Sequence, residues 1–292
     1  MNCAVRDWMV SVDEFETPLA GMRHLGVDAA ELELTRDFTV AALDARERVV
    51  LASDDDAVAY RRHLESLGIR PSAFLTAYDL GAEEPTASIK KIVRAIELAD
   101  IVGVPSIRID SRMERENELT FGARVALFTR CLQSALEQTA GSAVALGIEN
   151  HGVGGCNLAF HLNVYKAVGS DRLGTTLDTG NFYWAGYPLS EVYGIINILA
   201  PYVKHTHAKN INYPENMREI RREVGWEYKT YMCPIEEGDI DHGRVLAMLV
   251  AAGYDGDICL EDESLARFEP GAARIAVLKR DIAHLKACIA SV

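Results

Sequence analysis

The sequence predicts an α/β fold, a single (β/α)8 TIM barrel, and three observations carry this expectation. Short apolar, β-branched runs alternate with longer segments of helical period along the whole chain, which is typical of strands and helices around a parallel sheet. Eight such strand-like runs are present. Ionisable residues stand at the carboxyl ends of many of them, where a TIM barrel places its active site.

The predicted strands are five- to seven-residue runs bounded by turn residues or helical segments. They cover residues 2–6, 30–34, 72–77, 106–110, 144–150, 174–178, 203–208 and 257–261. Each is followed by a segment long enough for a helix, which gives eight strand-helix units. This number fits a closed barrel.

The helical segments show apolar residues at steps of three and four, as in 89–103 and 244–254. Several starts carry helix-capping residues, for example Ser11 with Glu14 three residues later, and Asp241 before the seventh helix. A glycine follows six of the helical runs, and we expect it to end the helix in the left-handed conformation. These glycines are Gly26, Gly68, Gly103, Gly141, Gly169 and Gly253.

A doubly wound open sheet is the alternative fold. A dinucleotide-binding sheet of that class has a G-x-G-x-x-G turn after an early strand, whereas the turn after the first strand here reads RDWMVSV. The glycine cluster at 152–155, GVGG, does not fit the pattern, and we expect a plain loop there. No linker or change in composition divides the chain, so residues 1–292 are predicted to form one barrel domain.

Composition limits the classes of function. The chain is 49% hydrophobic and 25% charged, with no apolar run of the roughly 20 residues that span a bilayer and no basic leader. We therefore expect a cytoplasmic protein that does not bind membranes. The six cysteines are widely spaced and predicted to be free thiols. A net charge of -13 disfavours nucleic-acid binding, and a homo-oligomer stays open.

Candidate metal ligands end the last four predicted strands, which read GIENH, TLDTGN, KHTHAKN and CLEDE. Residues two apart in a strand share a face, so Glu149, Asp178, Glu261 and one of the two histidines His205 and His207 are expected to meet at the mouth of the barrel. Three carboxylates and an imidazole suit one divalent metal ion: Mn²⁺, Mg²⁺, Co²⁺ or Zn²⁺. Without a cation the carboxylates would repel one another.

With these residues in place, the sequence resembles the xylose isomerase-like TIM-barrel superfamily, in particular its sugar phosphate isomerase/epimerase branch. The matching pieces are GVDAAELEL, GIENHG, TLDTGNF, HTHAKN, EEGDIDHGRVLAML and AAGYDGDICLED, in that order along nearly the whole chain. The resemblance implies a metal held by Glu149, Asp178, His207 and Glu261. It also places Glu31 at the position of the family's second-strand glutamate.

The resemblance further implies a metal-dependent isomerase or epimerase that acts on a keto sugar or related polyol through an enediolate. Glu149 and Glu261 would be the acid/base pair, one removing a proton and the other returning it to the opposite face. A lyase or dehydratase acting on a keto sugar or keto-inositol is the alternative, because the same intermediate can expel a β-hydroxyl. A non-catalytic sugar-binding barrel is a further alternative.

Further side chains near the strand ends are candidate substrate contacts, each with a plain packing or solvation role as the alternative. They are His151, Asn181, His205, Lys209, Arg6 and Arg108. The segment 210–237, between the seventh strand and its helix, is unusually long. It is predicted to be an ordered lid or specificity loop.

Two positions depart from the family pattern and make a simple ketose 3-epimerase doubtful. Asn181 stands where relatives often have a histidine, and Tyr213 stands where ketose epimerases have an arginine. No glycine-rich phosphate cradle is evident, so the family label does not establish a phosphorylated substrate. An endonuclease IV-like function is disfavoured, because the chain is acidic and has no histidine between His63 and His151 for a three-zinc cluster.

Overall fold

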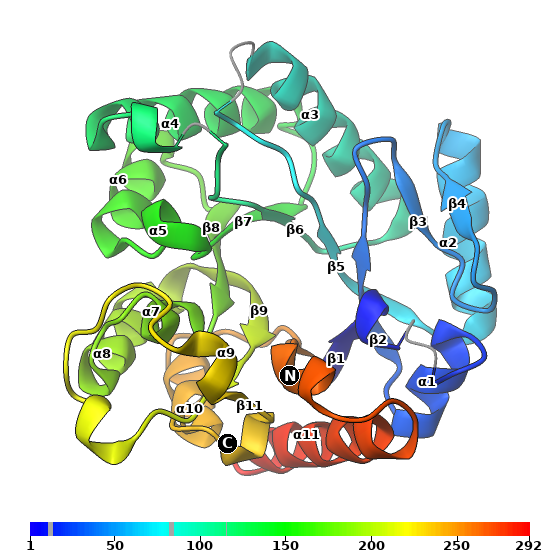
Figure 1. The fold of residues 1–292 in the computed structure, drawn as a ribbon. Helices are drawn as coiled ribbons and strands as arrows, with labels where there is room; N and C mark the ends of the chain where they lie inside the picture. The colour runs from blue at the N-terminus through cyan, green and yellow to red at the C-terminus, as the bar shows by residue number, and fades with distance from the viewer. Residues whose placement is uncertain (11–13, 82–84, 115) are drawn as a thin grey trace.

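Eight parallel strands close into a barrel in the computed structural model, which describes residues 1–10, 14–81, 85–114 and 116–292 (Figure 1). The barrel strands are β1 (Cys3–Arg6), β2 (Ala29–Glu33), β5 (Arg70–Leu75), β6 (Ser106–Ile109), β7 (Ala145–Glu149), β8 (Leu173–Asp178), β9 (Val203–Ala208) and β12 (Ile258–Leu260). They follow chain order around the barrel, and β1 pairs with both β2 and β12. The predicted TIM barrel is confirmed, and the open-sheet alternative is wrong.

Helices surround the barrel on the outside (Figure 1). The longer ones are α1 (Pro18–Leu25), α2 (Asp54–Leu67), α3 (Pro85–Val102), α4 (Phe121–Gln138), α6 (Leu158–Val168), α8 (Leu189–Leu199), α10 (His242–Ala251) and α11 (Ala272–Ala290). Three single turns, α5 (Gly152–Gly155), α7 (Asn181–Trp184) and α9 (Tyr228–Tyr231), lie in the loops. In the described part of the chain, every helix is too short or too polar to cross a membrane.

All eight predicted strands overlap an observed barrel strand. Two small antiparallel ladders were not predicted: β3 (Thr39–Ala41) pairs with β4 (Arg48–Val50), and β10 (Asn210–Ile211) pairs with β11 (Met232–Cys233). Both ladders are only two or three residues long, so their apolar alternation is too brief to separate from loop sequence. The second ladder closes the base of the long loop between β9 and α10.

Helix boundaries follow the predicted capping residues in most cases. Gly26, Gly68 and Gly169 end their helices with φ between 64° and 68°, and the Asp241 carboxylate accepts the N–H of Arg244 at the start of α10. The prediction for Gly141 is wrong, because α4 ends earlier. The other two glycines, at 103 and 253, also have positive φ.

Thr139 ends α4 in place of Gly141. Its backbone N–H and its hydroxyl both donate to the carbonyl of Ala135, at 3.2 and 2.8 Å. A side chain that satisfies a terminal carbonyl removes the need for a left-handed glycine. The proposed cap at Ser11 lies outside the described residues.

The prediction of a plain loop for the GVGG segment is wrong. These residues form the single helical turn α5. Gly152 opens it with φ of 69°. Gly155 is buried, and a Cβ there would overlap the side chain of Ser111. The glycines therefore allow a helical turn to pack closely against the end of β7.

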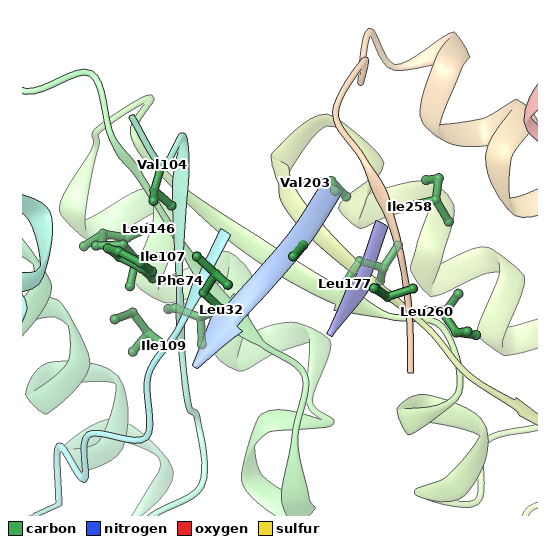
Figure 2. Close-up of a cluster of buried hydrophobic side chains, with 14 of the residues drawn as sticks. Leu32, Phe74, Val104, Ile107, Ile109, Leu146, Leu177, Val203, Ile258 and Leu260 are labelled. Carbon is green, nitrogen blue, oxygen red and sulfur yellow. The ribbon is translucent and has the colours of Figure 1, made fainter. Parts of the chain in front are cut away.

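Apolar side chains fill two separate regions. A large cluster lies between the strands and the helices, and Figure 2 shows part of it, including Leu32, Phe74 and Leu260. A small second cluster contains only Ala4, Ala29 and Cys259, from three adjacent strands. Two residues further along the same three strands stand Arg6, Glu31 and Glu261, so the barrel interior passes from small apolar to charged side chains toward the strand ends. All six cysteines are free, as predicted.

Candidate metal centre

Four side chains meet at the carboxyl ends of the strands, and they are the four that the resemblance implied as metal ligands. Glu149 ends β7, Asp178 ends β8, His207 lies in β9, and Glu261 directly follows β12. Each offers one ligand atom, and these atoms all lie within 4.8 Å of one another. None of the four residues is more than 5% exposed.

Strand register brings these residues to one level. Asp178 is paired with His207, and His207 is paired with Cys259, two residues before Glu261. Because paired residues in neighbouring parallel strands point to the same side of the sheet, the register sends all of these side chains into the barrel. The sequence predicted this meeting from alternation within each strand, and the closed barrel supplies the alignment between strands.

Glu149 and Glu261 are held in matching ways from the two sides of the site. One oxygen of each faces His207 Nδ1 at 3.2 Å. The other oxygen of each is bound by an arginine, since Arg108 contacts Glu149 Oε2 and Arg6 contacts Glu261 Oε1. Strands β7 and β12 flank the β8–β9 pair, so the two carboxylates reach the same point from opposite flanks.

Asp178 is fixed through its backbone and one oxygen. Asn150 exchanges two hydrogen bonds of 2.9 Å with the Asp178 main chain. Oδ1 accepts the N–H groups of Gly180 and Asn181, both at 2.8 Å. Oδ2 makes an ion pair with Lys209 Nζ at 3.0 Å. Because Oδ1 is bound by two backbone N–H groups, Oδ2 is the Asp178 oxygen that could bind a cation.

Glu31 anchors the opposite edge of the His207 ring. Glu31 Oε1 lies 2.8 Å from His207 Nε2 and 3.1 Å from His205 Nε2. Arg6 Nε is 3.2 Å from Glu31 Oε2. With Nε2 donating its proton to Glu31, Nδ1 of His207 is the nitrogen that faces Glu149 and Glu261. Nδ1 carries a proton for these carboxylates when no metal is bound, and it would offer its lone pair to a cation that displaces that proton.

The pKa values of the cluster are set by two opposing effects, burial of the side chains and the charges close to them. Burial alone would raise the pKa of Glu149, but the Arg108 guanidinium and His207 outweigh it and hold that pKa well below its usual range. Burial raises the pKa of Asp178 despite Lys209. Burial would lower the pKa of His207, but the charges of Glu31 and Glu149 raise it to about 9. Without a metal, the cluster holds carboxylates that require positive charge.

The residues fit a divalent cation. The four ligand atoms lie within 4.8 Å of one another, roughly twice a metal–oxygen distance of about 2.0 to 2.6 Å. Asp178 Oδ2 and Glu261 Oε2 are buried, and in the described residues each already faces a positive group: Lys209 for Asp178, and Lys209 with His207 for Glu261. Three carboxylates with one imidazole are a donor set suited to an ion of intermediate hardness. Cysteine is absent from it, unlike many structural zinc sites.

Five of the six predicted substrate contacts separate into three groups. Arg6 and Arg108 form ion pairs with the two glutamates. These ion pairs leave fewer of their N–H groups to bind a substrate. Lys209 and Asn181 lie beside the four ligands, with Lys209 Nζ 3.3 Å from Asn181 Oδ1. His151 stands at the rim, half-buried, where its Nδ1 is 2.9 Å from Asp110 Oδ1.

His205 differs from the other predicted contacts, because it lies deeper in the barrel. It is 1% exposed and within reach of Glu31, with its ring 5.5 Å from that of His207. The position therefore favours the packing alternative over a direct substrate contact.

Sequence reasoning missed two further members of the site. Asp110 lies 3.1 Å from Arg108 and binds His151, and its spacing of two residues from Arg108 was the available signal. Tyr228, in the middle of the long loop, donates to Glu263 Oε2. Glu263 in turn lies 2.8 Å from Lys209 Nζ. No local pattern indicates which residue of such a loop folds back onto the barrel.

Aromatic and cation–π contacts pack the long loop after β9. The guanidinium of Arg222 lies over the rings of Tyr183 and Tyr213, at 4.5 and 4.2 Å. Trp226 stacks on Tyr231 with ring centroids 5.6 Å apart. The turn α9 begins after Glu227, whose φ of 47° is unusual for a residue other than glycine. Aromatic packing thus fixes the segment that brings Tyr228 to the site.

Comparison with known proteins identifies the class. The model of the xylose isomerase-like TIM barrel family matches residues 19–288. The chain therefore belongs to this family, and the resemblance seen in its motifs is confirmed. A search of curated proteins finds no significant match.

Solved structures share the fold at low identity. The IolI protein with a bound zinc atom is 15% identical, with a TM-score of 0.69 over 99% of this chain and 96% of that chain. The structure described as L-ribulose 3-epimerase is 15% identical, with a TM-score of 0.61 and coverage of 99% and 96%. The probable 3-DHS dehydratase AsbF from Bacillus anthracis is 16% identical, with a TM-score of 0.65 and coverage of 98% and 99%.

Proposed function

We propose that this protein is a divalent-metal-dependent isomerase or epimerase of a keto sugar or related polyol, with Glu149 and Glu261 as the acid/base pair. The observation that carries the proposal is their matched placement: each directs one oxygen toward His207 Nδ1 while an arginine binds the other. Two carboxylates that reach one point from opposite flanks can act on the two faces of a planar intermediate.

Glu149, Asp178, His207 and Glu261 would hold the metal. When bound, the cation polarises the substrate carbonyl and stabilises the negative charge of an enediolate. Its identity among Mn²⁺, Mg²⁺, Co²⁺ and Zn²⁺ is left open by the donor set. The IolI structure, with its zinc atom, and the epimerase structure support a metal-dependent sugar reaction on this fold.

The protein's own residues move the proton. One glutamate removes a proton from the carbon beside the carbonyl; the electron pair of that C–H bond becomes the carbon–carbon double bond, and the carbonyl π pair moves onto its oxygen. Protonation of the opposite face of the same carbon by the other glutamate re-forms the carbonyl and gives the epimer. Protonation of the former carbonyl carbon instead, with transfer of the hydroxyl proton of the first carbon to the other oxygen, gives the isomer. Exchange with solvent returns both carboxyl groups to their starting states.

Neighbouring cations would orient the substrate. Lys209 lies 3.0 Å from Asp178 Oδ2 and 3.6 Å from Glu261 Oε2, so its ammonium can bind a substrate oxygen beside the reacting carbons. Asn181 offers an amide within 3.5 Å of Glu149 Oε1. Since Asn181 does not titrate, it can orient a hydroxyl but cannot relay a proton.

The test is a reaction in D₂O with the Mn²⁺-loaded protein and a panel of keto sugars. An isomerase or epimerase gives a product of the substrate's composition that carries solvent deuterium at the reacting carbon. The Glu149→Gln/Glu261→Gln double variant should show no labelling, while Glu269→Gln, an exposed position, should label like wild type. Labelling by the double variant would exclude this acid/base pair.

A dehydratase is the second candidate. The similarity of the fold to that of the probable 3-DHS dehydratase AsbF supports it. The same first step, removal of a proton beside a carbonyl, leads to loss of a β-hydroxyl as water. Mass spectrometry distinguishes the two reactions, because the dehydratase product is lighter by one water. A product lacking water from any panel member would move the protein to the lyase class.

A further inference from the structure

A polar cavity lies beside the metal centre, next to the ends of β5 and β6. Its volume is about 280 Å³, and charged residues dominate its lining. It is lined by Arg36, Ala77, Tyr78, Asp79, Asp110, Arg112, Met113 and Glu114. Apart from Asp110, none of these residues contributes to the site described above.

Asp110 connects this cavity to the metal centre. Its carboxylate lines the cavity, lies 3.1 Å from Arg108 and is 2.9 Å from His151 Nδ1. Arg108 contacts the ligand Glu149 with its other N–H groups. A single guanidinium therefore separates a metal-ligand carboxylate from a carboxylate of the cavity, a span on the order of 6 Å. The cavity and the metal centre are thus adjacent, joined through this one guanidinium.

Several polar groups of the cavity lack partners among the described residues. The side chain of Arg112 makes no hydrogen bond or ion pair there, and Arg36 uses only Nε, which donates to the carbonyl of Ala77 at 3.2 Å. Tyr78 is 2% exposed, yet its hydroxyl has no hydrogen-bond partner. Since buried polar groups are nearly always paired, this hydroxyl is free to bind a group that enters the cavity.

The carboxylates of the cavity are held in place. Asp79 accepts the backbone N–H groups of Gly81 and Glu114, at 2.8 and 3.3 Å. Asp110 accepts the N–H of Arg112 at 2.9 Å in addition to its contacts with Arg108 and His151. Each carboxylate oxygen still has lone pairs for a hydroxyl donor.

The balance of charge decides the class of ligand. Three carboxylates face two guanidinium groups across the lining, and Arg108 offsets Asp110. Such a cavity has no excess of positive charge, so it does not favour a phosphate or a carboxylate. Donors and acceptors side by side match the hydroxyl groups of a sugar, each of which both donates and accepts.

We propose that this cavity binds a second hydroxylated unit of the substrate, so that the protein acts on a glycosylated keto sugar. The inference rests on the proposed function, because it takes the keto unit to be the one held at the metal. Arg36 and Arg112 donate to hydroxyls of the second unit, and Asp79 and Asp110 accept from them. Tyr78 supplies the hydroxyl at the buried end.

The experiment compares binding of D-fructose with binding of the keto disaccharides turanose, maltulose, lactulose and palatinose. Calorimetric titration of the Mn²⁺-loaded full chain gives each affinity. At least one disaccharide should bind about tenfold more tightly than fructose, the gain expected from a few added charge-assisted hydrogen bonds. Arg112→Ala and Arg36→Ala should each remove most of that gain and leave fructose binding unchanged.

Arg62→Ala is the matched control, because Arg62 is exposed on α2, away from the cavity. If no disaccharide binds more tightly than fructose, or if Arg112→Ala weakens both sugars equally, the second subsite is excluded. If fructose 6-phosphate binds tightest and loses affinity in Arg112→Ala, the cavity takes an anion and the glycosylated class is wrong. Failure of the proposed function gives a different result. In that case the affinity for each sugar, fructose or disaccharide, would be the same with Mn²⁺ as without it.

Discussion

Glu31 and His207 form a buried pair in which the carboxylate oxygen lies 2.8 Å from Nε2 of the imidazole. The pair sets the tautomer of His207, and Nδ1 is left facing Glu149 and Glu261 at 3.2 Å. A carboxylate behind a histidine ligand fixes the ring and increases its basicity. Glu31 is thus a positioning residue that acts through His207.

Replacement of Glu31 by Gln should weaken metal binding. The amide keeps the shape, and its oxygen still accepts a hydrogen bond from the Nε2–H group of His207. It removes the negative charge that makes Nδ1 of His207 a more basic metal ligand. We expect the affinity for Mn²⁺ or Zn²⁺ to fall about 10- to 100-fold, measured by calorimetric titration of the chelator-treated protein. Glu33→Gln, two residues along β2 and exposed, is the control, and equal affinity of the two variants would contradict the positioning role.

Metal removal should lower the stability of the protein. A ligand that binds only the folded state adds about 2.7 kcal/mol at 100 times its dissociation constant. The melting temperature should therefore rise by several degrees when Mn²⁺ is added to chelator-treated protein, as followed by circular dichroism. Asp178→Asn should abolish that rise, because it weakens a ligand without enlarging the side chain. A rise of the same size in this variant would place the ion elsewhere.

Asp281 should make stability fall as pH rises. It is fully buried on α11, where Oδ1 accepts the N–H of Ile235 at 2.8 Å. Its Oδ2 and that of Asp262 have no partner among the described residues unless a proton lies between them. Burial and the charge of Asp262 raise the pKa of Asp281 to about 9, although Arg280 opposes this.

The sign follows from the protons bound. Between about pH 4 and pH 9 the folded protein keeps a proton that an unfolded aspartate, with a pKa of about 3.9, has released. Asp281→Asn mimics the protonated group, so it should match wild type near pH 4 and become more stable than wild type toward pH 8. The difference should grow by about 1 kcal/mol per pH unit. Urea unfolding measures it, with the exposed variant Asp37→Asn as control; a difference that does not change with pH would contradict the shared proton.

Tyr228→Phe should loosen the loop over the site. The variant removes the hydroxyl that donates to Glu263, a loss of about 1 to 2 kcal/mol for a bond to a charged group. Trypsin should then cut the loop several-fold faster at its arginines, such as Arg218 and Arg221, in a time course followed by mass spectrometry. Tyr231→Phe in the same turn keeps the ring that stacks on Trp226 and should be cut like wild type. Equal cutting of both variants would show that Tyr228 does not hold the loop.

The sequence by itself determined the barrel and the four residues that meet at its mouth. Strand period and helix caps are local properties, so all eight strands could be located. Glu149, Asp178, Glu261 and one of the two histidines of 203–208 could be grouped because alternation fixes the face of each strand end. The family resemblance then selected His207. The nature of 152–155 and the end of α4 could not be predicted, since each depends on packing or on a side-chain hydrogen bond particular to that place.

Only the tertiary structure decided how those residues are supported. Glu31 precedes His207 by 176 positions in the chain, and nothing local to either residue indicates their contact. The same holds for Arg108 with Glu149, for Tyr228 with Glu263, and for the cavity beside Asp110. Closure of the barrel sets these pairs, because it brings together strands and loops that are far apart in the chain. The local sequence around each residue does not indicate its partner.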